Sequence, residues 1–103
     1  MDDAGALKAF AALAGADRLA IVKLLVEAGP DGLNAGEIAR LLGAAPSRAS
    51  FHLSTLAETG MVSATKQART VTYRIDFAVM AGLVQFLMED CCKGAPQVRD
   101  CCG

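Results

Sequence analysis

The 103-residue sequence predicts a mainly α-helical fold that carries one β-hairpin toward its C-terminal end. Apolar residues recur at helical spacing through most of the chain, and Gly and Pro residues divide these stretches. Only residues 61–76 form Val- and Thr-rich runs in which apolar and polar residues alternate. The chain has no internal repeat and no long linker, so these elements are expected to form one domain.

Two helices are expected before residue 30. The apolar residues of the first are Leu7, Phe10, Ala11, Leu13 and Ala14. After Gly15, those of the second are Leu19, Ile21, Val22, Leu24, Leu25 and Val26. Asp17 is a residue type that caps helix N-termini, so we expect it to begin the second helix. The segment Gly29-Pro30-Asp31-Gly32 ends that helix.

A short third helix is expected over Ala35–Leu42, with Asn34 as its N-cap and Gly43 as its stop. Pro46 and Ser47 open a fourth helix that Gly60 ends. The spacing of the fourth helix predicts that its core face consists of Ala49, Leu53 and Leu56.

Two strands are expected at residues 61–66 and 70–76, with residues 67–69 as the loop between them. A final helix over about residues 77–90 is apolar around more than one face. The order is therefore α-α-α-α-β-β-α. Two short helices joined by a tight Gly-containing turn and followed by a hairpin are typical of a winged helix-turn-helix. In this arrangement the second of the two helices lies in the major groove of DNA.

Charge is unevenly distributed along the chain, whose net charge is −1. Residues 45–75 hold four basic residues against one acid, a net charge of +3, while the remainder has a net charge of −4. An electropositive middle segment favours double-stranded DNA as a partner. The 53% hydrophobic content indicates that part of the apolar surface is buried against another subunit. The acidic N-terminus and the absence of a long apolar run predict a cytoplasmic protein with no membrane partner.

The fourth helix leaves polar and aromatic residues on or near its outer face: Ser47, Arg48, Ser50, Phe51, His52 and Ser54. Ser hydroxyls and the helix N-terminus can bind phosphate, Arg48 can bind phosphate or guanine, and Phe51 can contact a thymine methyl group. Lys66 and Arg69, at the hairpin tip, would contact the DNA backbone or minor groove. Any one of these residues could instead be an ordinary solvated side chain, and His52 could be a hydrogen-bonded packing residue. Together they predict a DNA-reading surface.

Four stretches, in order along the chain, resemble the ArsR/SmtB family of metal-sensing repressors. They are residues 12–21 (ALAGADRLAI), 36–39 (GEIA), 50–53 (SFHL) and 60–62 (GMV). The similarity runs over roughly residues 5–90. It implies a homodimer with the first and last helices at the interface, and operator binding that is lost when a metal or metalloid binds.

The two best-known sensor sites of that family are missing here. Arsenic-responsive members often carry Cys-x-Cys in the third helix, but residues 33–37 hold no thiol. Zinc sensors carry His and Asp ligands in the last helix, but His52 is the only histidine of this chain. Some arsenic-responsive relatives instead have an adjacent Cys pair just after the last helix and a further thiol downstream. The C-terminal tail, residues 91–103, is similar to that pattern and holds every thiol of the chain: Cys91, Cys92, Cys101 and Cys102.

Trivalent arsenic suits this tail, because it forms three bonds to sulfur and needs no fourth ligand. The adjacent pair can supply two thiols, and the intervening eight residues can return Cys101 or Cys102 as the third. The C-terminal end of a helix disfavours anions, and three thiols on arsenous acid give a neutral product. Zinc and cadmium prefer four tetrahedral ligands, commonly spaced Cys-x₂₋₄-Cys. We expect As(III), or the related Sb(III), as inducer.

Several alternatives remain open on the same scaffold. They are a zinc, cadmium or lead sensor, a thiol-redox or persulfide switch, and a tail with no sensing role. A thiol-based carrier or reductase is disfavoured, since the chain has no Cys-x-x-Cys, no cofactor loop and no histidine near its cysteines. We therefore expect no enzymatic activity and no catalytic cofactor.

Overall fold

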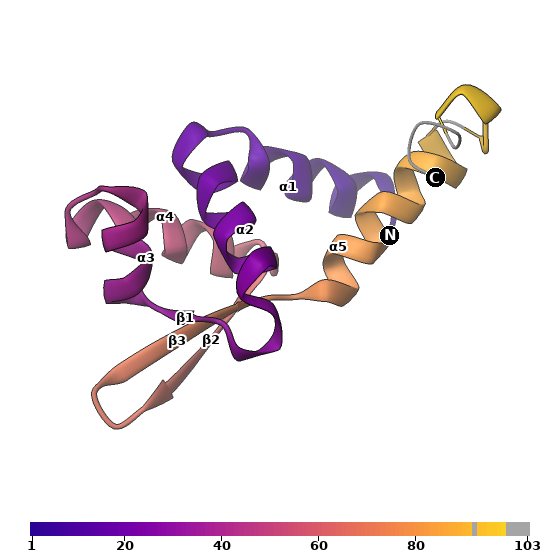
Figure 1. The fold of residues 1–103 in the computed structure, drawn as a ribbon. Helices are drawn as coiled ribbons and strands as arrows, with labels where there is room; N and C mark the ends of the chain where they lie inside the picture. Colours follow the sequence, from indigo (N-terminus) through magenta and orange to yellow (C-terminus); the bar gives the residue numbers. More distant parts are fainter. Residues whose placement is uncertain (92, 99–103) are drawn as a thin grey trace.

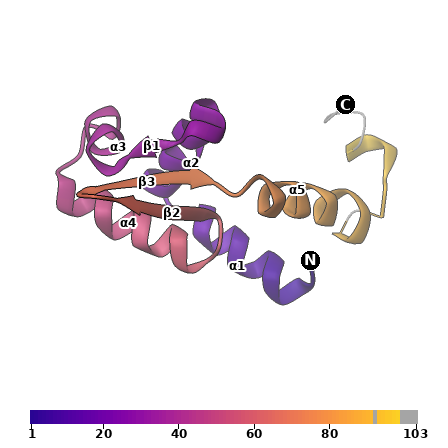
Figure 2. The same ribbon diagram turned by 90° about the horizontal axis from the view of Figure 1, so that it is seen from below.

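The structure, a computed structural model, describes residues 1–91 and 93–98. Within them, the helices form a body with a small antiparallel sheet along one edge, and the hairpin extends beyond this body (Figures 1 and 2). The helices are α1 Asp3–Leu13, α2 Ala16–Ala28, α3 Ala35–Leu42, α4 Pro46–Glu58 and α5 Phe77–Gln85. The strands are β1 Leu33–Asn34, β2 Val62–Gln67 and β3 Thr70–Ile75. This order confirms the winged helix-turn-helix prediction.

The ends of α3 agree with the sequence prediction. The Asn34 side chain accepts a hydrogen bond from the Glu37 backbone N–H (2.8 Å), and the Glu37 carboxylate accepts one from the Asn34 N–H (3.1 Å). This reciprocal capping box satisfies two amide groups that the helix itself cannot. Gly43, with φ of 71°, ends the helix in the left-handed conformation. The third helix is thus fixed at both ends by residues that lie within it or next to it.

The predicted cap of α2 was wrong. Gly15, not Asp17, is the N-cap, and no side chain caps this helix end. Asp17 lies in the first turn of α2, and its carboxylate is bound instead by residues of α4. The Arg18 guanidinium turns back to donate a hydrogen bond to the Ala12 carbonyl (2.9 Å), which joins α2 to the end of α1.

The sheet has three strands in the order β1-β3-β2, all antiparallel, rather than the two strands expected. The added strand, β1, pairs Leu33 with Tyr73 and thereby connects the start of α3 to the hairpin. A 3-10 turn, Gly29–Asp31, leads into it from α2. Gly32 follows with φ of 68°, and a side chain here would overlap the Tyr73 carbonyl oxygen. Only glycine fits this position without displacing β3.

The core lies where α2, α3, α4 and the sheet meet. Its largest fully buried side chains are Ile21, Leu25, Ile38, Leu53, Leu56 and Met61. Among the described residues no polar or charged side chain is buried with them. The predicted inward face of α4, namely Ala49, Leu53 and Leu56, is confirmed. This packing fixes which side of α4 can face a partner.

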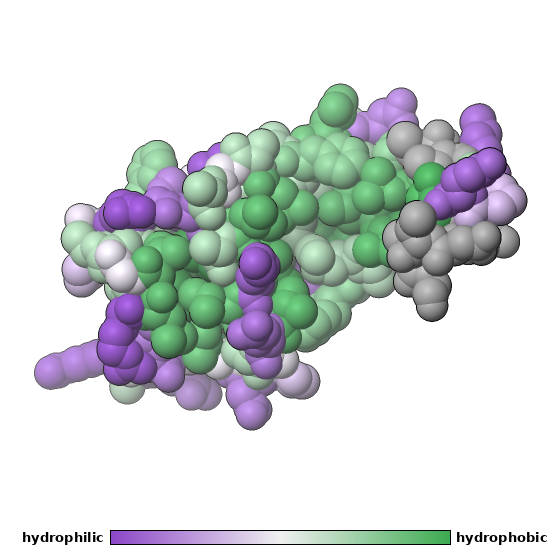
Figure 3. Space-filling view, turned by 45° about the horizontal axis from the view of Figure 1, so that its top comes forward, coloured by the Kyte–Doolittle hydropathy of each residue, from purple (hydrophilic) through white to green (hydrophobic). Residues whose placement is uncertain are grey.

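Helices α1 and α5 keep much apolar surface uncovered. The buried residues of α1 are Ala6, Ala9 and Ala12, whereas Leu7 is 67% exposed and Phe10 is 37% exposed. On α5 only Leu83 is buried, while Phe77 and Val84 are about half exposed. Hydrophobic side chains form a broad area that reaches toward the C-terminal end of the molecule (Figure 3). The expected single helix over residues 77–90 is α5 followed by a π-helical turn, Phe86–Cys91.

Candidate nucleic-acid interface

Helix α4 presents a polar outer face on the side opposite its buried residues. Ser47, Ser50 and Ser54 are exposed, and Phe51 is 66% exposed. Pro46 occupies the first turn of α4 and no side chain caps this end, so the helix N-terminus offers a favourable place for phosphate. Helix α3 packs against α4 as the supporting helix of the pair. These four predicted DNA-reading residues of α4 therefore share one accessible region, and their contact with DNA stays a prediction.

Two members of that set, Arg48 and His52, contact α2. The Arg48 guanidinium donates from Nε to Asp17 Oδ2 and from Nη2 to Asp17 Oδ1, both at 2.7 Å. His52 Nε2 lies 3.1 Å from Asp17 Oδ2. His52 Nδ1 is buried and has no hydrogen-bond partner among the described residues. The side chains of His52 and Phe51 meet edge to face, with ring centroids 5.4 Å apart.

The Asp17–Arg48 pair favours the ionised form of both side chains. Hydrogen bonds from Arg48, opposed by partial desolvation, hold the pKa of Asp17 below its ordinary value of 3.8. The same hydrogen bonds raise the pKa of the Arg48 guanidinium. A bidentate arginine–carboxylate pair also fixes the plane of the guanidinium. Asp17 was not predicted to belong to this site, because its partner lies 31 residues away and no local pattern reveals the contact.

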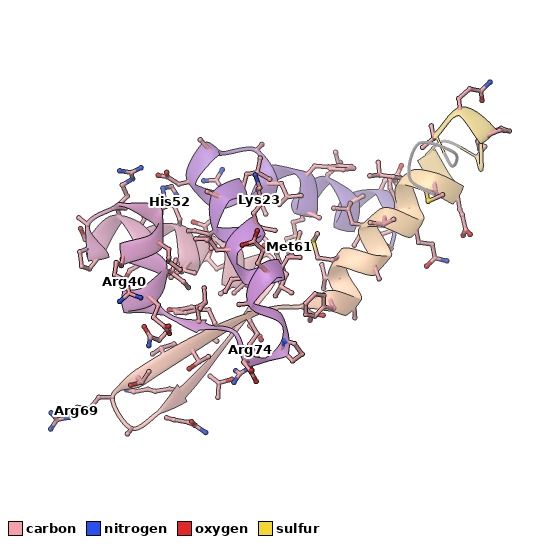
Figure 4. The ribbon with its side chains drawn as sticks, in the orientation of Figure 1. Lys23, Arg40, His52, Met61, Arg69 and Arg74 are labelled. Carbon is pink, nitrogen blue, oxygen red and sulfur yellow. The ribbon has the colours of Figure 1, made fainter. Side chains whose placement is uncertain are left out.

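The hairpin supplies the remaining predicted DNA contacts. Lys66 and Arg69 are exposed, Lys66 near the end of β2 and Arg69 in the turn that follows, and Arg69 points away from the body at the hairpin tip (Figure 4). Arg74, also in the electropositive segment, has a structural role. It donates hydrogen bonds to the Pro30 carbonyl (3.0 Å) and the Thr65 hydroxyl (3.1 Å), which brace the base of the hairpin.

The predicted thiol site lies mostly outside the residues that the structure describes. Cys92, Cys101 and Cys102 lie outside the described residues, and of Cys91 only the backbone, at the end of the π-helical turn, is described. That turn is at the end of the molecule far from α4 and the hairpin (Figure 1). Among the side chains that the structure describes, no three from His, Cys, Asp or Glu gather as a potential metal site.

Known proteins share this architecture. A helix-turn-helix domain family matches residues 13–63. HlyU from Vibrio cholerae N16961 is 30% identical, with 89% of this chain and 99% of that chain covered and a TM-score of 0.69. An ArsR-like transcriptional regulator from Rhodococcus sp. RHA1 is 24% identical, with 94% and 89% covered and a TM-score of 0.76. The chain belongs to the ArsR family of winged helix-turn-helix transcriptional regulators.

Another solved relative of this ArsR-family regulator is the antimony-specific transcriptional repressor AntR. It is 29% identical, with 76% of this chain and 69% of that chain covered and a TM-score of 0.62. No curated protein matches the sequence. None of the described helices of this regulator has the length and apolar character needed to cross a membrane.

Proposed function

We propose that this protein is an arsenite-responsive transcriptional repressor of the cytoplasm. As a homodimer without inducer it binds operator DNA through α4 and the hairpin, and it releases the DNA when As(III) binds Cys91, Cys92 and either Cys101 or Cys102. The observation that carries this proposal is the position of the thiols. All four lie in the last thirteen residues, from the end of the π-helical turn that follows α5, and the first ninety residues of this DNA-binding regulator contain none.

The chemistry of the tail supports a trivalent metalloid over a divalent cation. Glu89 and Asp90 precede the Cys pair at the C-terminal end of a helix, where the helix dipole is also negative. Arsenous acid and three thiols form three As–S bonds and release three waters, so the product is neutral. Four thiolates bound to a divalent cation would instead leave a charge of −2 at this acidic end of the helix. The relative AntR is named for antimony, the heavier element of the same group, which also supports this ligand class.

Release would act through α5 and the subunit contact. The exposed apolar residues of α1 and α5, such as Leu7, Phe10, Phe77 and Val84, favour a dimer through these two helices. A dimer presents two copies of α4 to half-sites about 34–36 Å apart. Closing the tail onto the end of α5 would shift one subunit against the other and change this separation. A coupling free energy of about 1–3 kcal/mol between the two sites is enough to alter operator occupancy markedly.

The test measures release of a labelled operator by fluorescence anisotropy, with arsenite, antimonite, zinc, cadmium, lead and peroxide added separately. We expect release by arsenite and antimonite under reducing conditions. Cys91→Ser and Cys92→Ser should bind DNA like the wild type but resist arsenite, whereas Gln97→Ser, a tail change that removes no thiol, should respond normally. Normal release from both cysteine variants would refute the proposal. Release by peroxide alone would indicate a redox switch, and release by zinc, cadmium or lead alone would indicate a divalent-metal sensor.

A further inference from the structure

Asp17 joins the first turn of α2 to the DNA-reading helix. Both of its carboxylate oxygens accept hydrogen bonds from Arg48 at 2.7 Å, and His52 Nε2 approaches one of them at 3.1 Å. The Asp17 side chain is only 22% exposed, whereas that of Arg48 remains 54% exposed. The carboxylate is therefore largely enclosed behind an arginine that still faces solvent.

The geometry leaves Arg48 able to bind a second partner. A guanidinium has five N–H donors, and Asp17 takes one from Nε and one from Nη2. The three remaining donors share the plane that the carboxylate has fixed. Arg48 is the third residue of α4, and in helix-turn-helix proteins the N-terminal residues of the recognition helix meet the DNA.

We propose that Asp17 is a positioning residue that holds Arg48 in one orientation and thereby sets the preference of the protein for its operator over other DNA. This inference rests on the proposed reading of DNA by α4. Asp17 itself would touch no nucleotide.

Asp17 acts on the specific complex through the orientation of Arg48. A free arginine can bind the phosphates of any duplex, whereas a fixed guanidinium meets its DNA partner only when α4 is docked in the correct register. The negative charge of the Asp17 carboxylate weakens the sequence-independent attraction to phosphate in both complexes alike, so this effect leaves their ratio unchanged. Loss of the fixed orientation should weaken the specific complex relative to the non-specific one, even though the positive charge of Arg48 remains.

The experiment uses the full chain and two duplexes: the highest-affinity sequence selected by the wild type from a random library, and a scrambled duplex of the same composition. Dissociation constants for both, measured in one buffer, give a specificity ratio. We expect Asp17→Asn to lower this ratio about fivefold, the lower end of what one base contact contributes. Glu58→Gln is the matched control, because it removes one exposed acid from the end of α4; it should strengthen binding to both duplexes alike.

Two further variants separate positioning from a general structural effect. Arg48→Lys keeps the positive charge but cannot form the bidentate pair with Asp17. It should therefore lower the specificity ratio as Asp17→Asn does, without any substitution in α2. In an Arg48→Ala background, Asp17→Asn should leave the ratio unchanged. The inference is overturned if Asp17→Asn and Arg48→Lys both keep the wild-type ratio, or if Asp17→Asn acts equally in the Arg48→Ala background. If the wild type selects no sequence from the library, the proposed function fails and this inference fails with it.

Discussion

Leu53 and Phe51 are two residues apart on α4, but truncating Leu53 should destabilise the fold far more than truncating Phe51. Leu53 is fully buried in the core cluster, whereas Phe51 is 66% exposed. Leu53→Ala removes three carbons, worth about 0.8 kcal/mol each, and leaves a cavity that adds to this cost. We expect it to lower the free energy of unfolding by about 3 kcal/mol. Phe51→Ala should change that free energy by no more than about 0.5 kcal/mol.

Urea unfolding followed by far-UV circular dichroism measures both values. All samples need the same protomer concentration, because the stability of a dimer depends on it. Phe51→Ala should also weaken binding to the selected duplex, since the ring is removed from the proposed contact surface. The assignment of faces on α4 would be refuted if Leu53→Ala cost less than about 1 kcal/mol, or if Phe51→Ala cost as much as Leu53→Ala.

Three further changes test local features of the fold. Asn34→Ala removes the α3 cap and should cost about 1 kcal/mol in thermal or urea unfolding, while Asn34→Ser, which keeps an acceptor oxygen, should cost much less. Gly32→Ala forces a side chain against the Tyr73 carbonyl and should destabilise the fold far more than Gly60→Ala, where φ is also positive but space is open; equal losses would contradict the close approach. Because Arg48 lowers the pKa of Asp17 below 3.8, the ionised carboxylate stabilises the folded state above that pH. The stability gap between wild type and Asp17→Asn should thus shrink as the pH falls from about 5 to below about 4; a gap that widened over this range would contradict the sign.

Local sequence signals predicted most of the helix-turn-helix. Asn34, Gly43 and Pro46 each act through backbone groups within a few residues, so their effect on α3 and α4 can be read from the chain itself. The apolar spacing of α4 likewise predicted its buried face, because one helix face had to meet the core.

Features that depend on distant residues were not predictable in this way. Strand β1 has two residues and exists only because Leu33 and Asn34 reach β3. Asp17 fits the pattern of a helix cap, but Arg48 and His52 bind its carboxylate from another helix. The exposed apolar residues of α1 look like core residues in the sequence, and only their exposure in the fold separates Leu7 and Phe10 from Ala6 and Ala9.

If the C-terminal thiols are the sensor and the rest of the chain reads DNA, removing the thiols should abolish the response to arsenite and leave DNA binding intact. The most direct measurement compares wild type with the full-length chain in which all four cysteines are replaced by serine, each bound to the same labelled duplex and titrated with arsenite under reducing conditions. We expect equal affinity for DNA without arsenite, release of the wild type, and no release of the serine variant. Equal release of both proteins by arsenite would contradict it.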